Sequence, residues 1–355
     1  MNEKFNLALL FGGRGYERDV SISGAEFLLS KVDKEKYKTT LVHITEEGEW
    51  QIPLEETDSI AALVKQTCKA TAVAPVFIGG RGGLVSRGSF TEISVAFPLL
   101  HGDYGEDGIV QGALENARIP FVGQGTKTGA LLSDKIYTKI VAEHLGIPTA
   151  KWTLGIRDSR IYTKSRAKAT AEKAFSYPIF LKPSSLGSSV GASAVLCEEG
   201  FDPAYTLAES LGDGRVLLEE CLDVKRELEC AYFSAFGKEL FTNIGEISYT
   251  DGFYDYDSKY SGASKASVRT AADITCETRK QILEYSKSLV SYFGIRDLSR
   301  IDFFLTQDGR LLFNEINTLP GFTESSLYPR LLEEAGVDTQ SLITSLLQNA
   351  MERGA

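Results

Sequence analysis

The sequence predicts a mixed fold, in which an α/β region with a mostly parallel sheet precedes α+β regions with antiparallel strands. Apolar runs alternate with helical patterns through the first 125 residues, which is the order expected of a βαβ sheet. Two later pairs of apolar runs flank glycine-containing turns, at Phe236-Gly237 and Asp308-Gly309, as is typical of antiparallel hairpins. A length of 355 residues allows about two or three domains.

The parallel sheet is expected from apolar runs that are bounded by glycine and other turn residues. The predicted strands of this region cover residues 5–11, 37–44, 93–100 and 121–123. Apolar periodicity predicts helices between the strands, over residues 21–30, 61–69 and 109–117. The glycine-rich stretch 79–89 predicts a turn or a hairpin.

The rest of the chain predicts more helices and shorter strands. The expected helices cover residues 132–145, 203–210, 277–293 and 339–351. The expected strands cover residues 177–183, 195–196, 216–218, 227–233, 239–247, 300–306 and 310–316. Residues 248–274 are polar and aromatic with little periodicity, and a loop of this length is usually functional, often as a lid.

Composition and charge limit the classes of function. Apolar residues make up 43% of the chain and charged residues 24%, which is enough to build a packed core. The net charge of −10 argues against a nucleic-acid-binding surface, although a nucleotide needs only a few local cations. Five cysteines without a CxxC pair and three histidines argue against disulfides and against a cysteine or histidine metal centre. Without a long apolar run or a signal-like N-terminus, a cytoplasmic protein with no membrane contact is expected.

The hairpin around Asp308-Gly309 carries a group of polar side chains. A two-residue turn there places Asp302 opposite Glu315 and Arg300 opposite Asn317, with all four on one face. Two opposed carboxylates repel each other unless a cation lies between them, and carboxylate and amide oxygens are the ligands that magnesium prefers. The spacing therefore predicts either a magnesium site or a solvated polar face on which Arg300 screens both acids.

A second group of small residues follows a predicted strand that ends near Lys182. Residues 183–191 are rich in serine and glycine, so backbone N–H groups and hydroxyls could approach phosphate oxygens beside the lysine. The segment is not a Walker A loop, because no Gly-Lys-Ser/Thr sequence follows. An ordinary turn is the alternative interpretation.

The glycine-rich turn after the first predicted strand carries Glu17. It resembles part of a dinucleotide-binding fingerprint, but Arg18 occupies the place of the third glycine, so an NAD-binding oxidoreductase is disfavoured. A carboxylate at this position fits recognition of a substrate ammonium group. Alternatively, Glu17 is a helix-start carboxylate near Ser21.

At these residues the sequence resembles the D-alanine–D-alanine ligase family of the ATP-grasp superfamily. The resemblance follows nearly the whole chain in order, through FGGRGYERDVS (11–21), PLLHGDYGEDGIVQG (98–112), IPFVGQG (119–125), SDKIYTK (133–139), LKPSSLGSSVG (181–191), RELECA (226–231), GFYDYDSKY (252–260), SRIDFF (299–304) and FNEINTLPGFTESSLYP (313–329). It implies an ATP-grasp fold with an N-terminal Rossmann-like domain. The implied units are that domain (1–125), a central ATP-grasp subdomain (126–221), and a C-terminal subdomain (222–355) with a lid loop (248–274).

The resemblance also implies the reaction. ATP would phosphorylate the carboxylate of a first D-alanine, and the amine of a second D-alanine would attack the D-alanyl phosphate. The product would be D-alanyl-D-alanine, a precursor for peptidoglycan synthesis and hence for cell-wall biogenesis and cell shape. The implied cofactors are ATP and two Mg²⁺ ions, with Mn²⁺ as a substitute, and the family often forms a homodimer through its N-terminal region.

The family's site residues can be carried over by position. The metal ligands would be Asp302, Glu315 and Asn317. The residues that contact ATP would be Lys135, Lys182, Ser189 and Lys259 at the phosphates, Glu227 at the ribose, and Glu219, Glu220 and Leu222 beside the adenine. An insertion in residues 223–225 leaves open which of the two adjacent glutamates meets the adenine.

Further positions match the family's substrate and catalytic residues. Glu17 would hold the ammonium of the first substrate, in one hydrogen-bonded group with Ser188 and Tyr260, and His101 would line the same pocket. The tetrahedral oxyanion would be stabilised by Arg300 and the backbone at Gly321, and the second substrate's carboxylate by Ser326 and the backbone of Leu327.

Two positions bear on the substrate. Tyr260 favours D-alanine as the acceptor, because a phenol keeps Glu17 and Ser188 hydrogen-bonded. Tyr16 stands where the family usually has a small residue and is expected to crowd the first-substrate pocket. The alternatives are a D-Ala-D-Ser or D-Ala-D-lactate ligase of the glycopeptide-resistance type, and a non-catalytic ATP-binding relative.

Overall fold

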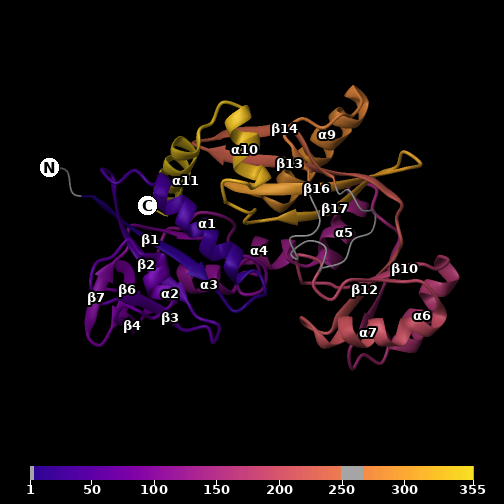
Figure 1. Ribbon diagram of the computed structural model, residues 1–355, viewed down its shortest axis with the longest axis horizontal. Helices are drawn as coiled ribbons and strands as arrows, with labels where there is room; N and C mark the ends of the chain where they lie inside the picture. Colours follow the sequence, from indigo (N-terminus) through magenta and orange to yellow (C-terminus); the bar gives the residue numbers. More distant parts are fainter. Residues whose placement is uncertain (1–3, 249–266, 355) are drawn as a thin grey trace.

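The computed structural model describes residues 4–248 and 267–354, and Figure 1 shows their arrangement. The elements gather around three main sheets, with α11 of the C-terminal region lying beside α1 of the N-terminal region (Figure 1). In these two stretches, no helix combines the length and apolar character needed to cross a membrane. The predicted boundaries near residues 125 and 221 fall between the three sheets and stay a prediction.

The N-terminal sheet has the strand order β4-β3-β2-β1-β8. Its parallel centre, β1 (Phe5–Gly12), β2 (Tyr37–Ile44) and β8 (Val95–Pro98), confirms the predicted strands, while β3 (Trp50–Pro53) and β4 (Ala70–Ala72) add an antiparallel edge. Successive β1 residues are buried on opposite faces of the sheet, which explains its continuous apolar run. The covering helices are α1 (Arg18–Lys31), α2 (Ile60–Val64) and α3 (Ile109–Asn116), of which α2 is shorter than predicted.

The glycine-rich stretch 79–89 is mostly strand. It forms β6 (Arg81–Ser86) at the centre of a small antiparallel sheet, between β5 (Ala74–Ile78) and β7 (Ser89–Glu92). A Cβ atom on Gly82 would lie 2.6 Å from the carbonyl oxygen of Ala117, so the glycine permits close packing against the end of α3.

The central sheet is antiparallel, with the order β11-β10-β12-β9. Its strands are β9 (Trp152–Ile156), β10 (Ile179–Pro183), β11 (Ser193–Val195) and β12 (Arg215–Glu220). The helices α6 (Lys164–Ala174) and α7 (Phe201–Ser210) pack on it, and a short 3₁₀ turn (Glu198–Gly200) precedes α7. Two helices, α4 (Thr126–Leu132) and α5 (Lys135–His144), precede it. Neither β9 nor α6 was predicted from the sequence. In α6 only alanines, Ala167 and Ala171, are buried, so its apolar periodicity is weak.

The C-terminal sheet has the order β15-β14-β13-β16-β17. Its strands are β13 (Val224–Ala235), β14 (Lys238–Ser248), β15 (Ser267–Arg269), β16 (Leu298–Thr306) and β17 (Leu311–Asn317), and its helices are α9 (Cys276–Phe293), α10 (Leu327–Glu334) and α11 (Thr339–Gly354). The antiparallel pair β13–β14 turns at Phe236-Gly237, as predicted. Part of the predicted loop 248–274 is strand, since Ser248 pairs with Ser267, and residues 249–266 lie outside the described residues.

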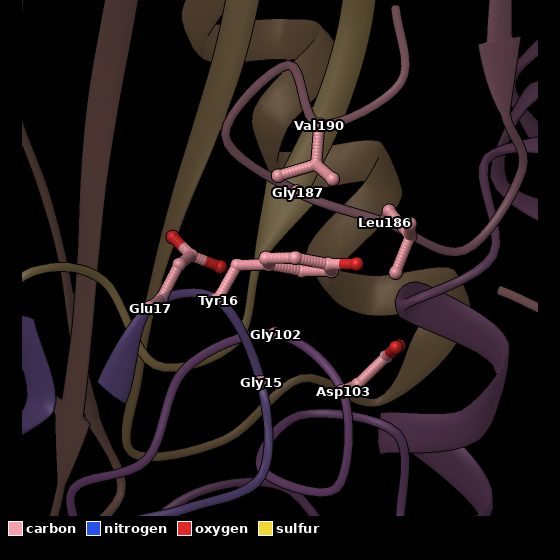
Figure 2. Close-up of a pocket in the computed structure, with 8 residues that line it drawn as sticks. All are labelled: Gly15, Tyr16, Glu17, Gly102, Asp103, Leu186, Gly187 and Val190. Atoms are coloured by element: carbon pink, nitrogen blue, oxygen red, sulfur yellow. The ribbon is translucent and has the colours of Figure 1, made fainter. Parts of the chain in front are cut away.

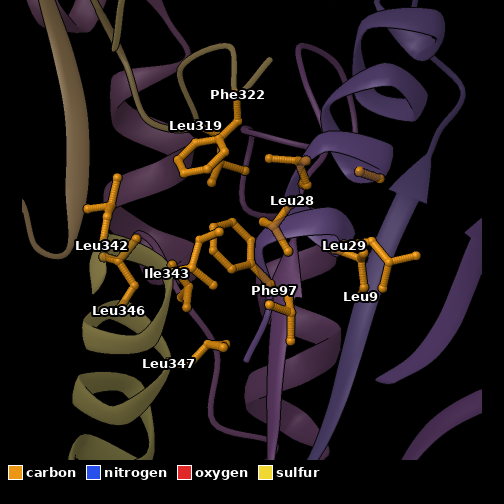
Figure 3. Packing of buried hydrophobic residues seen from close by; sticks show 14 of the residues in the cluster. Leu9, Leu28, Leu29, Phe97, Leu319, Phe322, Leu342, Ile343, Leu346 and Leu347 are labelled. Atoms are coloured by element: carbon orange, nitrogen blue, oxygen red, sulfur yellow. The ribbon is translucent and has the colours of Figure 1, made fainter. Parts of the chain in front are cut away.

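One hydrophobic core joins the N- and C-terminal regions. Leu9, Leu28 and Phe97 of the N-terminal sheet and its first helix pack with Phe322 and with leucines of α11 such as Leu346 (Figure 3). Together they cover one face of β1 and β8. The C-terminal helix α11 therefore packs against the N-terminal sheet as well as against the C-terminal sheet.

Candidate functional site

The β16–β17 hairpin pairs the predicted polar residues as expected. Asp302 lies opposite Glu315, and Arg300 lies opposite Asn317. The predicted two-residue turn is wrong, however, because Thr306 pairs with Arg310 through the hydrogen bond from Thr306 N to Arg310 O (3.0 Å). Three residues therefore form the turn, and a β-bulge between Asp302 and Phe303 restores the predicted register at the site.

A third carboxylate extends this pair into a row across three strands. Glu229 on β13 lies directly opposite Asp302, which in turn lies opposite Glu315, so the three side chains share one face. Glu229 and Asp302 are buried. Glu229 was not predicted as a site residue, because the pairing of β13 with β16 joins segments about seventy residues apart.

Arg300 lies within this row and contacts two of the acids. Its Nε and Nη2 atoms donate to Oδ1 and Oδ2 of Asp302 at 2.8 and 2.7 Å, and Nε lies 3.0 Å from Oε2 of Glu229. Asn317 donates a further bond to Asp302 Oδ2 at 2.9 Å. Burial disfavours the charged guanidinium, but Asp302 and then Glu229 outweigh it and raise the pKa of Arg300 well above its usual range.

Lys135 connects this row to the serine- and glycine-rich loop at 184–191. It is the first residue of α5, whose N-terminus is capped by the side chain of Asp134. Its Nζ atom lies 3.0 Å from Oε2 of Glu315 and donates to the carbonyl of Leu186 at 2.7 Å. Burial lowers the pKa of Lys135 and Glu315 raises it, with a net increase. Lys135 is thus held as a cation between the two segments.

Two buried lysines, Lys182 on β10 of the central sheet and Lys139 on α5, share one acid. Glu219 receives Lys139 Nζ at 2.6 Å and Lys182 Nζ at 2.7 Å. Burial alone would raise the pKa of Glu219, but Lys139 and Lys182 lower it to about 2. Burial also lowers the pKa of Lys182. Lys139 was not predicted, although its spacing of four from Lys135 places both on one helix face.

Glu219 and Glu220 have different surroundings. Glu220 Oε1 accepts from Lys151 N and from Arg310 Nη1, both at 3.0 Å, away from the lysine pair. This separation follows from strand alternation on β12. Leu222 and Glu227 are half-buried, and Glu227 lies opposite Ile247 and Phe304 on the C-terminal sheet.

Glu17 meets the serine- and glycine-rich loop. Ser188 Oγ donates to Glu17 Oε1. A Cβ atom on Gly102 would lie 2.7 Å from Glu17 Oε2, and one on Gly187 would lie 3.1 Å from it, so the carboxylate lies between two glycines. Ser188 and the next residue, Ser189, have φ values of +50° and +59°, which is uncommon for residues other than glycine and is typical of functional loops.

A small cavity opens beside Glu17 (Figure 2). It is lined by Gly15, Tyr16, Glu17, Gly102, Asp103, Leu186, Gly187 and Val190. The ring of Tyr16 extends across it, with its hydroxyl toward Leu186 (Figure 2). Burial and then the charge of Asp107 raise the pKa of Asp103 to about 6.

A second cavity of about 40 Å³ adjoins the first, because Gly102, Leu186 and Gly187 line both. Its wall includes Lys135, Glu315 and Asn317. The arrangement therefore brings Glu17 and Ser188, the lysine at the start of α5 and the end of β17 around one continuous region.

The remaining predicted residues fall into three groups. Gly321, Ser326 and Leu327 lie together: a Cβ atom on Gly321 would lie 3.1 Å from Ser326 Oγ, and Leu327 begins α10. His101 is buried and pairs through Nδ1 with the carbonyl of Leu319 at 2.8 Å, outside the lining of both cavities. Lys259 and Tyr260 lie outside the described residues.

The donor set fits a divalent cation that is shared with a ligand. Among the described residues of the row, the carboxylates of Glu229, Asp302 and Glu315 face the cations Arg300 and Lys135, which leaves one excess negative charge. Within the described ranges, however, no group of three acidic, histidine or cysteine side chains could hold an ion by itself. A magnesium ion here would need further oxygen ligands, such as phosphate.

Sequence comparison identifies relatives along the whole chain. Residues 6–124 match the family described as "D-ala D-ala ligase N-terminus", and residues 141–348 match "D-ala D-ala ligase C-terminus". A protein of Deinococcus radiodurans named D-alanine--D-alanine ligase is 36% identical over 351 residues, which cover 98% of this chain and 99% of that protein.

Solved structures agree with this comparison. The VanG D-Ala:D-Ser ligase from Enterococcus faecalis is 29% identical with a TM-score of 0.86, covering 98% of this chain and 100% of that one. The D-alanyl-alanine synthetase A of Vibrio cholerae is 28% identical with a TM-score of 0.84, covering 98% and 99%. The predicted family and the ATP-grasp fold class are therefore confirmed.

Proposed function

Because the chain belongs to the D-alanine–D-alanine ligase family and is an ATP-dependent ligase, we propose that it joins two D-alanines through a D-alanyl phosphate. The product would serve peptidoglycan precursor synthesis. The observation that carries the proposal is the position of Lys135, which pairs with Glu315 and also donates to the loop at Leu186. A lysine there lies between the row of acids on the C-terminal sheet and the lysines of α5 and β10.

The central sheet would bind the nucleotide. Lys139 and Lys182 against the single carboxylate of Glu219 leave one excess positive charge in a buried site, which favours an anion such as phosphate. Of the two adjacent glutamates, Glu219 lies with the lysines, so we assign it rather than Glu220 to the nucleotide side. The positive φ values at Ser188 and Ser189 support a phosphate-cradling role for their loop.

The C-terminal sheet would hold the metal. Asp302, Glu315 and Asn317 are the residues that would bind Mg²⁺, and the excess negative charge of the row supports this assignment. When bound, the ion supplies positive charge beside the phosphate oxygens. Lys135 neutralises Glu315 from the other side and would orient the same phosphates.

The first D-alanine would bind beside Glu17. The carboxylate is held by Ser188 between two glycines, where a small substrate ammonium can approach it. Tyr16 and Leu186 limit the size of the substrate side chain in this cavity (Figure 2). His101 would support the site indirectly, by holding the Leu319 carbonyl in place through its hydrogen bond.

The second D-alanine would bind at the N-terminus of α10. Ser326 and the backbone N–H of Leu327 would hold its carboxylate, since Leu327 begins α10 and N–H groups at a helix start bind anions. Arg300 and the Gly321 N–H would stabilise the tetrahedral oxyanion, and one such donor contributes about 3–4 kcal/mol. Tyr260 and Lys259 are proposed to complete the site from the predicted lid, which would exclude water from the acyl phosphate.

A D-Ala-D-Ser ligase is the second candidate, because the VanG enzyme of that activity superposes with a TM-score of 0.86.

A competition reaction separates the two candidates. The purified protein receives ATP, Mg²⁺ and equal D-alanine, D-serine and D-lactate, with L-alanine as the control, and the products are identified by mass spectrometry. We expect mostly D-Ala-D-Ala. If D-Ala-D-Ser or D-Ala-D-lactate is the main product, the ligase reaction is supported but D-alanine is refuted as the preferred acceptor. ATP binding without any product would refute the ligase proposal. Light scattering of the same sample tests whether this chain forms the homodimer expected from its resemblance to the family.

A further inference from the structure

The guanidinium of Arg300 occupies both oxygens of a proposed metal ligand. Two of its nitrogens donate to the two oxygens of Asp302, at 2.8 and 2.7 Å. If Asp302 binds a divalent cation, that cation and the guanidinium compete for one carboxylate, and the two positive charges repel each other. Arg300 therefore needs a second anchor to keep its position when the metal binds.

Glu229 supplies that anchor. Its Oε2 atom lies 3.0 Å from Arg300 Nε, and its side chain is only 4% exposed. It stands on β13, on the far side of Asp302 from Glu315, so it lies outside the pair of strands that would bind the ion. Glu229 and Asp302 thus hold Arg300 between them.

Resting on the function proposed above, we propose that Glu229 is a positioning residue that retains Arg300 while Asp302 transfers to the divalent cation. Without Glu229, Arg300 would lose one of the two carboxylates that hold it. The ion would then have to displace the guanidinium, and Arg300 would lose the orientation needed at the oxyanion. Glu229 acts only through Arg300 and contacts neither substrate nor nucleotide in this scheme.

The isosteric Glu229→Gln variant tests the proposal, with Glu229→Asp as the conservative comparison. A matched control is Glu246→Gln: Glu246 is also 4% exposed and pairs with an arginine, Arg226, but it lies opposite Leu228, on the other face of the same sheet. The first readout is the Mg²⁺ concentration at which ADP half-maximally raises the unfolding temperature, which needs no turnover.

We expect Glu229→Gln to raise this Mg²⁺ midpoint and to lower kcat, each by about tenfold or more, as is usual for residues that orient metal ligands. Glu229→Asp should shift both less, and Glu246→Gln should leave the midpoint unchanged. An unchanged midpoint in Glu229→Gln, or in Glu229→Asp if the glutamine variant does not fold, would overturn the proposal. A wild-type chain that shows no Mg²⁺-dependent response to ADP would overturn the proposed function along with it.

A double-mutant cycle with Arg300→Lys gives a second readout. If Glu229 acts through Arg300, the double variant should bind Mg²⁺-ADP about as weakly as the weaker single variant. Additive losses would mean that Glu229 acts independently of Arg300, and they would overturn the proposal even if each single variant is impaired.

Discussion

Arg353, near the end of α11, forms a two-point ion pair with Asp297, a fully buried residue just before β16. Its Nη1 and Nη2 atoms lie 2.7 and 2.8 Å from the two carboxylate oxygens. Asp297 also accepts from the backbone N–H of Gly123 at 2.8 Å. The carboxylate of Asp297 therefore connects α11 to Gly123, in the segment that follows the N-terminal sheet.

Replacing Arg353 with methionine should destabilise the protein by about 3 kcal/mol, because it leaves a buried carboxylate without its counter-charge. Urea unfolding measures the loss. The control is Arg81→Met, which breaks the exposed Arg81–Glu92 pair and should cost less than about 1 kcal/mol. If the two variants lose the same free energy of unfolding, the buried Arg353–Asp297 pair does not contribute more stability than the exposed pair.

Lys182→Met should abolish ADP formation. The substitution removes a cation from the proposed phosphate site and leaves Glu219 paired with Lys139 alone. Coupled-enzyme detection of ADP in the presence of D-alanine measures the effect. Lys173→Met, at an exposed position of α6, is the control and should retain wild-type turnover. Turnover by Lys182→Met would refute the placement of the phosphates.

Glu219→Gln should raise the KM for ATP much more than Glu220→Gln does. Loss of the Glu219 charge removes the acid that holds Lys139 and Lys182 in position, so we expect the KM for ATP to rise about tenfold or more. Glu220→Gln keeps an oxygen for the Lys151 N–H and should change KM by less than about threefold. The opposite order would assign the adenine side to Glu220.

His43 should make the protein sensitive to mild acid. The ring is 2% exposed and stacked on Phe11, and neither ring nitrogen has a hydrogen-bond partner within the described residues. Burial, followed by the charge of Arg18, lowers the pKa of His43 to about 4. His43 therefore gains a proton near pH 6.5 in the unfolded chain but only near pH 4 in the folded chain. The contribution of neutral His43 to the free energy of unfolding is complete above pH 6.5, and it is lost as the pH falls from 6.5 to 4.

The size of this effect follows from His43→Leu. Between pH 7 and pH 5, wild type should lose about 1–2 kcal/mol more than the variant, in thermal or urea unfolding at both pH values. Carboxylates that titrate in the same range contribute equally to both proteins and cancel in the difference. Parallel pH profiles would show that His43 titrates normally.

Tyr16 should control which first substrate is accepted. Its ring extends across the cavity beside Glu17, so Tyr16→Ala should admit larger D-amino acids while raising the KM for D-alanine several-fold (Figure 2). Product analysis with D-2-aminobutyrate as the first substrate measures the change. Tyr137→Ala, which removes an exposed tyrosine of α5, is the control for the loss of an aromatic side chain.

The hairpin shows how far the sequence could predict the site. Alternation and the Asp308-Gly309 turn predicted the correct partners of Asp302 and Arg300, but the turn has one residue more than expected and the bulge compensates for it. The predicted register at the site was thus correct although two of its local causes were not foreseen.

Contacts between distant segments were beyond the reach of local patterns. Glu229 meets Arg300 only because β13 pairs with β16, and Asp297 meets Arg353 across 56 residues of chain. Strand periodicity could have shown that Glu227 and Glu229 share a face, but not which strand would lie beside them. Lys139 is the exception, since a helical spacing of four from Lys135 was visible in the sequence.

The shared hydrophobic core has a consequence for the order in which the chain is made. The ribosome releases β1 and β8 long before α11, because more than 200 residues separate Pro98 from Thr339. Until that helix emerges, Leu9 and Phe97 lack the leucines that cover them in the finished protein. The nascent N-terminal sheet therefore carries an apolar face that is only partly covered through most of translation, and its final packing is a late step that depends on the last described helix.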